Sequence, residues 1–244
     1  MHSLLLVSHL AGPHFAAQAE AALASGADAL VLDLAGAGDG EMGLATRQVC
    51  DFLRAAQPMA RRPQLVMRIP VLDAPVGRGV LDHLIAAGAD GILLPEAQGG
   101  NDVTRLDARI SVEEAVHGID HGHVKILAEA GATAHGVLGL ASFRGASHRL
   151  TGLVWSAERL AADLGGIGVR MPDGTLRAPL SFALGQFLIA AAAARITAIY
   201  DGTGRGHAAP AAFAAARDDG FAAGLTDDTA EIAVIAEAMT AARG

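Results

Sequence analysis

Charged residues of this sequence stand where several short apolar runs end, a position at which parallel strands often present side chains for chemistry, and five of them carry the hypotheses below. They are Asp33 in ALVLDL, Arg68 in QLVMRIP, Glu96 in GILLPEA, Glu129 in VKILAEA and Arg159 just after GLVWSA. A guanidinium can hold a carboxylate or a thioester oxygen through a forked pair of hydrogen bonds. A carboxylate can orient an arginine, move a proton or bind a metal ion. The five residues are therefore candidates for a site that handles an anionic substrate.

The runs before these residues belong to a repeating pattern of strands and helices. We expect strands at Ser3–His9, Ala29–Leu34, Gln64–Pro70, Gly91–Ala97, Val124–Ala130, Gly152–Ala157, Ile196–Gly202 and Phe221–Asp227. Helical stretches separate them, and several runs are apolar on both faces, as in a parallel sheet covered by helices. About eight such units predict an α/β fold, a (β/α)8 TIM barrel that forms one domain over residues 1–244. An open, doubly wound sheet is the alternative. In a barrel, the five candidates would meet at the C-terminal face.

The composition excludes several kinds of partner. The formal net charge is −8, from 18 basic and 26 acidic residues without a basic stripe, so we expect neither nucleic acid nor a membrane as partner. No uninterrupted apolar run reaches about 18 residues, and the N-terminus lacks a basic leader, so we expect a cytoplasmic protein. The single cysteine, Cys50, excludes an intrachain disulfide.

Several of these stretches, in this order, resemble the HpcH/HpaI aldolase and citrate lyase superfamily, most closely its citrate lyase β-subunit-like branch. The similar stretches include ASGADALVLDL, GADGILLPEAQ, TAHGVL and SAERLAADLGG, of which the last is the most specific. The resemblance implies a (β/α)8 barrel that forms a homo-oligomer, commonly a trimer. It also implies that carbon–carbon bonds are cleaved or formed in CoA esters or small hydroxy or oxo acids. The family uses Mg²⁺ held by a Glu and an Asp, and an arginine that stabilises the enolate.

The chain departs from the family's pattern at these metal ligands. The alignment through TAHGV places the metal glutamate at Ala132, and the metal aspartate falls at Arg159. A methyl group cannot bind Mg²⁺, and a guanidinium about 4 Å from the ion would be repelled by roughly 8 kcal/mol at an effective dielectric constant near 20. Glu129 lies three residues before Ala132, where a change of register could bring it to the barrel mouth. We therefore predict no metal ligands and name no firm cofactor, although the family implies Mg²⁺.

The resemblance assigns roles to the five candidates. Arg68 matches the family's arginine and is predicted to bind the enolate oxygen, while Asp33 matches a family aspartate and is predicted to orient Arg68 or a water molecule. These two are the predicted catalytic residues. The predicted substrate-binding residues are Arg68, Arg159, Glu129 and Glu96, and Arg159 would supply the positive charge that relatives take from Mg²⁺. In the alternative interpretation, Arg68 is a structural arginine paired with Asp33 or Glu96.

Two functions stay open from the sequence. One is a carbon–carbon lyase or aldolase that has diverged from the Mg²⁺-dependent mechanism. The other is a catalytically inactive homologue that binds an anionic metabolite or serves as a regulatory or structural subunit. In both, the expected partner is a small anionic metabolite or an acyl-CoA ester. We also expect a short or missing C-terminal lid segment, because the chain stops at Gly244.

Three further motifs carry weaker hypotheses. The histidine cluster HGIDHGH, His117–His123, could place His117 and His121 on one helical face, and we interpret it as an adventitious surface metal site. The glycine-rich GTGRGH, Gly202–His207, lacks the spacing of a phosphate loop, although its Arg205 could meet an anion at the rim. The basic stretch SFRGASHR, Ser142–Arg149, is interpreted as a solvated loop, with anion binding as the alternative.

Overall fold

Strands and helices alternate along the chain as the sequence predicts. A computed structural model describes residues 1–38, 40–71, 75–204 and 210–241. The strands are β1 (Ser3–Val7), β2 (Ala29–Asp33), β3 (Gln64–Arg68), β4 (Gly91–Leu94), β5 (Lys125–Glu129), β6 (Leu150–Trp155), β7 (Thr197–Asp201) and β8 (Ala223–Thr226). The α-helices are α1 (Phe15–Ala24), α2 (Met42–Ala56), α3 (Pro75–Ala86), α4 (Gly100–His117), α5 (Ala134–Leu138), α6 (Ala157–Asp163), α7 (Ala178–Ala194), α8 (Pro210–Asp219) and α9 (Ile232–Thr240). Two short 3-10 helices are η1 (Leu140–Phe143) and η2 (Thr229–Glu231).

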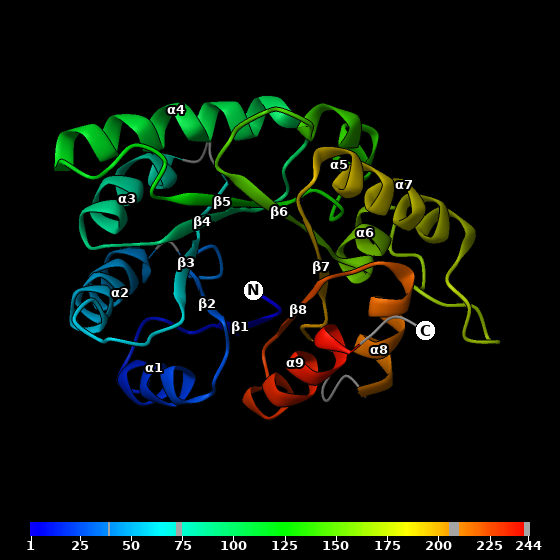
Figure 1. The fold of residues 1–244 in the computed structure, drawn as a ribbon, viewed down its shortest axis with the longest axis horizontal. Coiled ribbons are helices and arrows are strands. Elements are labelled where there is room, and N and C mark those ends of the chain that lie inside the picture. The colour runs from blue at the N-terminus through cyan, green and yellow to red at the C-terminus, as the bar shows by residue number, and fades with distance from the viewer. Residues whose placement is uncertain (39, 72–74, 205–209, 242–244) are drawn as a thin grey trace.

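The strands close into a parallel barrel in sequence order, and β8 pairs with β1. Figure 1 shows the strands in the middle and the helices arranged around them. The prediction of a (β/α)8 TIM barrel is therefore confirmed, and each predicted strand overlaps an observed one. Several predicted strands ran too far at their carboxyl ends. The prediction carried β4 to Ala97, for example, but Glu96 has a φ of 49°, which lies outside the β region and ends the strand.

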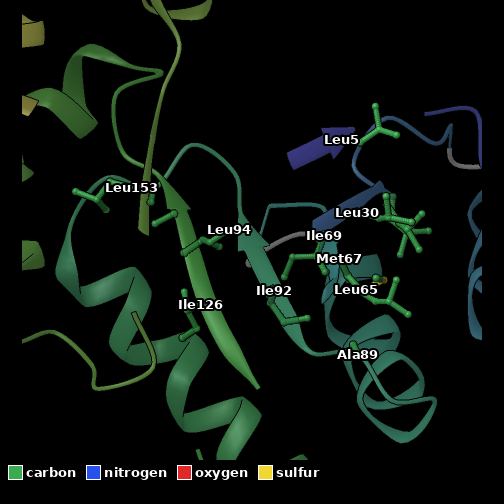
Figure 2. Close-up of a cluster of buried hydrophobic side chains, with 14 of the residues drawn as sticks. Leu5, Leu30, Leu65, Met67, Ile69, Ala89, Ile92, Leu94, Ile126 and Leu153 are labelled. Atoms are coloured by element: carbon green, nitrogen blue, oxygen red, sulfur yellow. The ribbon is translucent and has the colours of Figure 1, made fainter. Parts of the chain in front are cut away.

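The alternation of side chains along the strands divides the core into two layers. Inside the barrel lie Leu4, Ala29, Val31, Val66, Leu93, Leu127, Val154, Ile199, Ala223 and Leu225. The strand residues between them face outward, and Figure 2 shows part of this outer layer, with Leu30, Met67, Ile92, Ile126 and Leu153 among the labelled side chains. Both faces of the strands are thus covered, which explains why the sequence reads as continuous apolar runs.

A buried arginine secures the N-terminal end of β6. The side chain of Arg149 is 0% exposed. Its Nε donates to Asp107 Oδ1 at 2.6 Å, and its two Nη atoms donate to Glu114 at 2.7 and 2.6 Å. Further bonds run to the Val124 carbonyl and to the Ser111 hydroxyl. The interpretation of Ser142–Arg149 as a solvated loop is therefore wrong for its last residue, which ties α4 to β5 and β6.

Helix α7 also differs in part from its predicted environment. The sequence predicts a buried barrel helix at Leu180–Ala193, and the inner face does bury Leu180 and Phe187. On its outer face, however, Phe182 is 67% exposed and Ile189 is 71% exposed. Within the described part of the chain, every helix is too short or too polar to cross a membrane.

Candidate functional site

The inner face of the barrel brings three of the predicted residues together at the carboxyl ends of neighbouring strands. Asp33 lies two positions after the inward-facing Val31, and Glu129 lies two positions after the inward-facing Leu127. Arg68 has the same relation to Val66. Because side chains point to the same face at every second position, all three point into the mouth of the barrel. Strand pairing places Asp33 directly beside Arg68, and Arg68 reaches across β4 to β5.

Arg68 is the centre of the resulting network. Its Nε donates to Glu129 Oε1 at 2.6 Å, and its Nη2 donates to Glu129 Oε2 at 3.2 Å, which makes a forked pair. Its Nη1 donates to Asp33 Oδ1 at 2.9 Å. The side chains of Arg68, Asp33 and Glu129 are 11%, 12% and 3% exposed, respectively. The structure therefore shows that Asp33 is bonded to Arg68 and that Glu129 reaches the mouth.

Arg159 completes the network from the opposite side of Glu129. It lies in the first turn of α6, which begins directly after Ser156 at the end of β6. Its Nη1 donates to Glu129 Oε2, and its side chain is 32% exposed. The loop before α5 is held against α6, because the Ala134 backbone N–H donates to Asp163 Oδ2 at 2.7 Å. The two loops that carry the stretches TAHGVL and SAERLAADLGG thus support each other.

The charges of this network balance, and they fix Arg68 as a cation. Burial acts to lower the pKa of Arg68, but the hydrogen bonds and charge of Glu129, followed by those of Asp33, outweigh burial and raise the pKa above its usual range. Two guanidinium groups and two carboxylates give the four side chains no net charge. A ligand would therefore meet directed N–H groups at the mouth rather than a strong positive field.

Arg68 and Arg159 differ in how many of their N–H groups donate hydrogen bonds to the protein. A guanidinium carries five N–H groups. Among the described residues, Arg68 uses three of them and Arg159 uses one. Arg159 is also the more exposed of the two. Its remaining N–H groups are the part of this network best placed to meet a ligand.

Glu96 does not join this network. It lies on the loop after β4, it is exposed, and its side chain makes no hydrogen bond or ion pair with a described residue. The alternative pairing of Arg68 with Glu96 is therefore wrong, because Glu129 takes that place. Glu96 and His9, after β1, both adopt a positive φ, 49° and 58°, which is uncommon for residues other than glycine. Arg205 lies outside the described residues.

The mouth does not fit the Mg²⁺ site of the family. Magnesium needs free carboxylate or other oxygen ligands in octahedral geometry. Both oxygens of Glu129 already accept N–H groups from Arg68, and Oε2 also accepts from Arg159. Ala132, at the aligned ligand position, is buried and carries only a methyl group. An ion on Glu129 would have to displace two cations, so we derive no step through a metal here.

The central place of Glu129 was only partly predictable. The alignment through TAHGV drew attention to Ala132, and Glu129 was interpreted as a residue that a change of register could bring in. In the structure, β5 ends at Glu129 itself, and Ala132 lies in the segment between β5 and α5, which begins at Ala134. The inward alternation from Leu127 to Glu129 was the signal in the sequence that favoured this position.

A closed parallel barrel of eight strands, with a polar network at its C-terminal mouth, defines a (β/α)8 barrel protein. A family model for HpcH/HpaI aldolase/citrate lyase matches residues 9–230. The chain therefore belongs to the HpcH/HpaI aldolase and citrate lyase family. A search of proteins with curated descriptions gives no match.

Solved structures of similar fold include citrate lyase β subunits. RipC from Yersinia pestis is 20% identical, with a TM-score of 0.75 over 99% of this chain and 96% of that one. The citrate lyase β subunit from Mycobacterium tuberculosis, complexed with oxaloacetate and magnesium, is 23% identical, with a TM-score of 0.73 over 98% and 96%. CitE from the same organism, in complex with magnesium, acetoacetate and coenzyme A, is 23% identical with a TM-score of 0.73, over 99% of this chain and 81% of that one. These likenesses establish the fold.

Proposed function

We propose that this protein is a carbon–carbon lyase or aldolase of the citrate lyase β-subunit-like kind that works without Mg²⁺ at its barrel mouth. Its substrate would be a CoA ester or a small hydroxy or oxo acid. The observation that carries the proposal is the position of Arg159, whose guanidinium bonds to Glu129 and keeps most of its N–H groups available. In this proposal, a cation of the chain takes the role that the family gives to a metal cation.

The residues of the mouth suit the electrostatic demands of such a reaction. Cleavage of a 3-hydroxyacyl compound moves the electron pair of the carbon–carbon bond onto the acyl carbonyl oxygen. The uncommitted N–H groups of Arg159 and Arg68 would donate to this developing oxyanion, and one lost donor of this kind typically costs about 10²–10³ in rate. Glu129 is the positioning residue, because it fixes both guanidinium groups.

Asp33 has the second role in this scheme. Its Oδ1 accepts from Arg68 at 2.9 Å and from the Gly36 N–H at 3.2 Å, whereas Oδ2 accepts no hydrogen bond from a described residue. Oδ2 would take the proton of the substrate hydroxyl as the carbon–carbon bond breaks. The same proton then returns to the enolate carbon, so the carboxylate is regenerated and the atoms balance.

A second candidate is a homologue that binds a carboxylate metabolite without turnover. The observation that favours it is the pairing of both mouth carboxylates with arginines, which engages both oxygens of Glu129 and one oxygen of Asp33. In this version, Arg159 and Arg68 still hold the anion. The two candidates share a ligand class and differ only in the proton transfer assigned to Asp33.

The test is an assay of malyl-CoA and citramalyl-CoA cleavage in the presence of a chelator. We expect turnover without added Mg²⁺ and at least a hundredfold loss in Arg68→Ala. Arg54→Ala is the matched control, because Arg54 is an exposed arginine of α2 whose ion pair among the described residues is with Asp51. Turnover that appears only on addition of Mg²⁺ would contradict the proposal. Thermal stabilisation by the same compounds without turnover would favour the second candidate.

A further inference from the structure

Three potential metal ligands meet between two neighbouring helices, far from the mouth. Asp82 lies near the end of α3, and Glu113 and His117 lie in the last part of α4. Figure 1 shows α3 and α4 side by side on the outside of the barrel. The helices of such a barrel run opposite to its strands, so the ends of α3 and α4 lie toward the N-terminal face. This place is distinct from the network of Arg68 and Arg159.

The side chains already point at one another. The His117 Nε2 atom is 2.7 Å from Asp82 Oδ1 and 4.0 Å from Glu113 Oε2. One ligand atom from each of the three residues lies within 4.8 Å of the other two. Ligands around a four-coordinate ion at about 2.0–2.2 Å stand about 3–4 Å apart, so small rotamer changes would admit an ion. Glu113 and His117 are four residues apart on α4 and therefore share a helical face.

The electrostatics of the place favour a cation. Asp82 and Glu113 contribute two carboxylates, and their side chains are 45% and 25% exposed. The carboxyl end of α4, at His117, and the nearby end of α3 each add the partial negative charge of a helix C-terminus. His83 also lies close, with its Nδ1 atom 3.6 Å from Asp82 Oδ2. Two carboxylates and two helix ends thus lie around the His117 imidazole, with the His83 imidazole beside Asp82.

We propose that Asp82, Glu113 and His117 form a binding site for a divalent transition metal ion, such as Zn²⁺, that links α3 to α4. An imidazole nitrogen beside carboxylate oxygens favours Zn²⁺, Co²⁺ or Ni²⁺ over Mg²⁺ or Ca²⁺, which prefer oxygen ligands alone. Water would fill the remaining coordination position. Bound metal would stabilise the packing of the two helices, because it binds the folded chain and not the separated ligands.

This set of ligands differs from the one that the sequence indicates. In the run HGIDHGH, His117 and His121 are four residues apart, but α4 ends at His117, so the two do not share a helical face. The His121 ring instead lies 5.3 Å from that of His148, and its Nδ1 atom is 3.2 Å from Arg149 Nη2. Only the first histidine of the run faces the acidic pair. The partners of His117 come from across the helix interface and from the preceding turn.

The test is calorimetric titration of the full, untagged, metal-free chain with Zn²⁺, with Co²⁺ absorption as a spectroscopic check. We expect one equivalent to bind wild-type protein and to raise its melting temperature. Asp82→Asn and Glu113→Gln should each weaken binding at least tenfold, and His117→Ala should abolish it. The double variant His121→Ala/His123→Ala is the matched control and should bind as wild type does.

The amide variants are nearly isosteric, so a metal-free melting temperature close to that of wild type would attribute their loss of binding to the missing ligand. If one of them fails to fold, the other still tests the proposal, because each removes a different ligand. The site is refuted if Zn²⁺ does not bind stoichiometrically, or if Asp82→Asn and Glu113→Gln bind as wild type does. Loss of binding in the double histidine variant alone would assign the metal to the run HGIDHGH instead.

Discussion

Arg149 and Arg68 are both buried arginines held by carboxylates, and they lie at opposite ends of the same barrel. Arg149 is 0% exposed at the N-terminal end, and it bonds to Asp107, Glu114, Ser111 and a backbone carbonyl. Arg68 is 11% exposed at the C-terminal mouth, where it bonds to Asp33 and Glu129. At the N-terminal end, every nitrogen of the guanidinium is committed to the protein. At the mouth, the network continues to the part-exposed Arg159, which has committed one N–H group among the described residues.

The difference teaches which arginine holds the fold together and which can hold a ligand. An arginine whose N–H groups all bond to the protein has no donor left for a substrate. Its removal leaves its carboxylate partners buried without a counter-charge. An unsaturated network at a strand-end mouth has donors that a ligand can use. We therefore expect changes at Arg149 to act on stability, and changes at Arg68 and Arg159 to act mainly on ligand binding and turnover.

The largest expected effect is the loss of stability in the variant Arg149→Ala. The change leaves Glu114, which is 1% exposed, without its principal cationic partner. Breaking a buried pair in this way costs about 3–5 kcal/mol of the free energy of unfolding. Urea denaturation followed by circular dichroism measures the loss. A loss under 1 kcal/mol would show that the two buried networks do not differ as described.

Arg68→Ala should lower both the stability of the fold and the ligand binding or turnover at the mouth. We expect turnover or ligand binding to fall at least a hundredfold, because the variant loses an oxyanion donor and the fork that positions Glu129. The free energy of unfolding should fall by about 1–3 kcal/mol, less than for Arg149→Ala. Arg68→Lys keeps the charge without the fork and should recover little activity. Full activity in Arg68→Lys would contradict a directional role for the guanidinium.

Arg159→Ala should weaken ligand binding while it leaves stability nearly unchanged. Its side chain is 32% exposed, so its pairing with Glu129 contributes at most about 1 kcal/mol to stability. The affinity for a carboxylate ligand should nevertheless fall about tenfold or more, which equals roughly 1.4 kcal/mol. Calorimetry with pyruvate or acetoacetate measures this affinity, with Arg54→Ala as the control. A variant that loses stability but binds its ligand normally would make Arg159 a structural residue.

The smallest expected effect is the dependence of stability on acid pH. Burial acts to raise the pKa of Glu114, but hydrogen bonds from Arg149 and from the Val124 and Gly122 N–H groups outweigh burial and hold it below the usual range. Because the folded pKa is depressed, its stabilising contribution is present above the unfolded pKa of about 4.3 and is lost as the pH falls through the folded pKa. Urea midpoints at pH 7, 5, 4 and 3 should therefore fall less steeply in Glu114→Gln than in wild type. Equal slopes would contradict this account of Glu114.

The sequence predicted the barrel because each strand is apolar on both faces, and it predicted the mouth because charged residues end several of those strands. It correctly linked Asp33 to Arg68, which are neighbours in the strand register. It did not predict the burial of Arg149, whose partners Asp107 and Glu114 are 42 and 35 residues away, on helix α4. Glu96 does not join the network of Arg68, because β4 ends at Leu94 and Glu96 lies on the loop that follows. Its predicted role in substrate binding stays a prediction.

The central claim is that arginines occupy the place of a metal at the mouth, and titration of the full chain with Mg²⁺ tests it most directly. We expect no stoichiometric binding at millimolar Mg²⁺, because the Glu129 oxygens are committed to Arg68 and Arg159. Ligand affinity should likewise be the same with and without chelator. One equivalent of Mg²⁺ that is lost in Glu129→Gln but retained in Asp82→Asn would place a metal at the mouth and contradict the account.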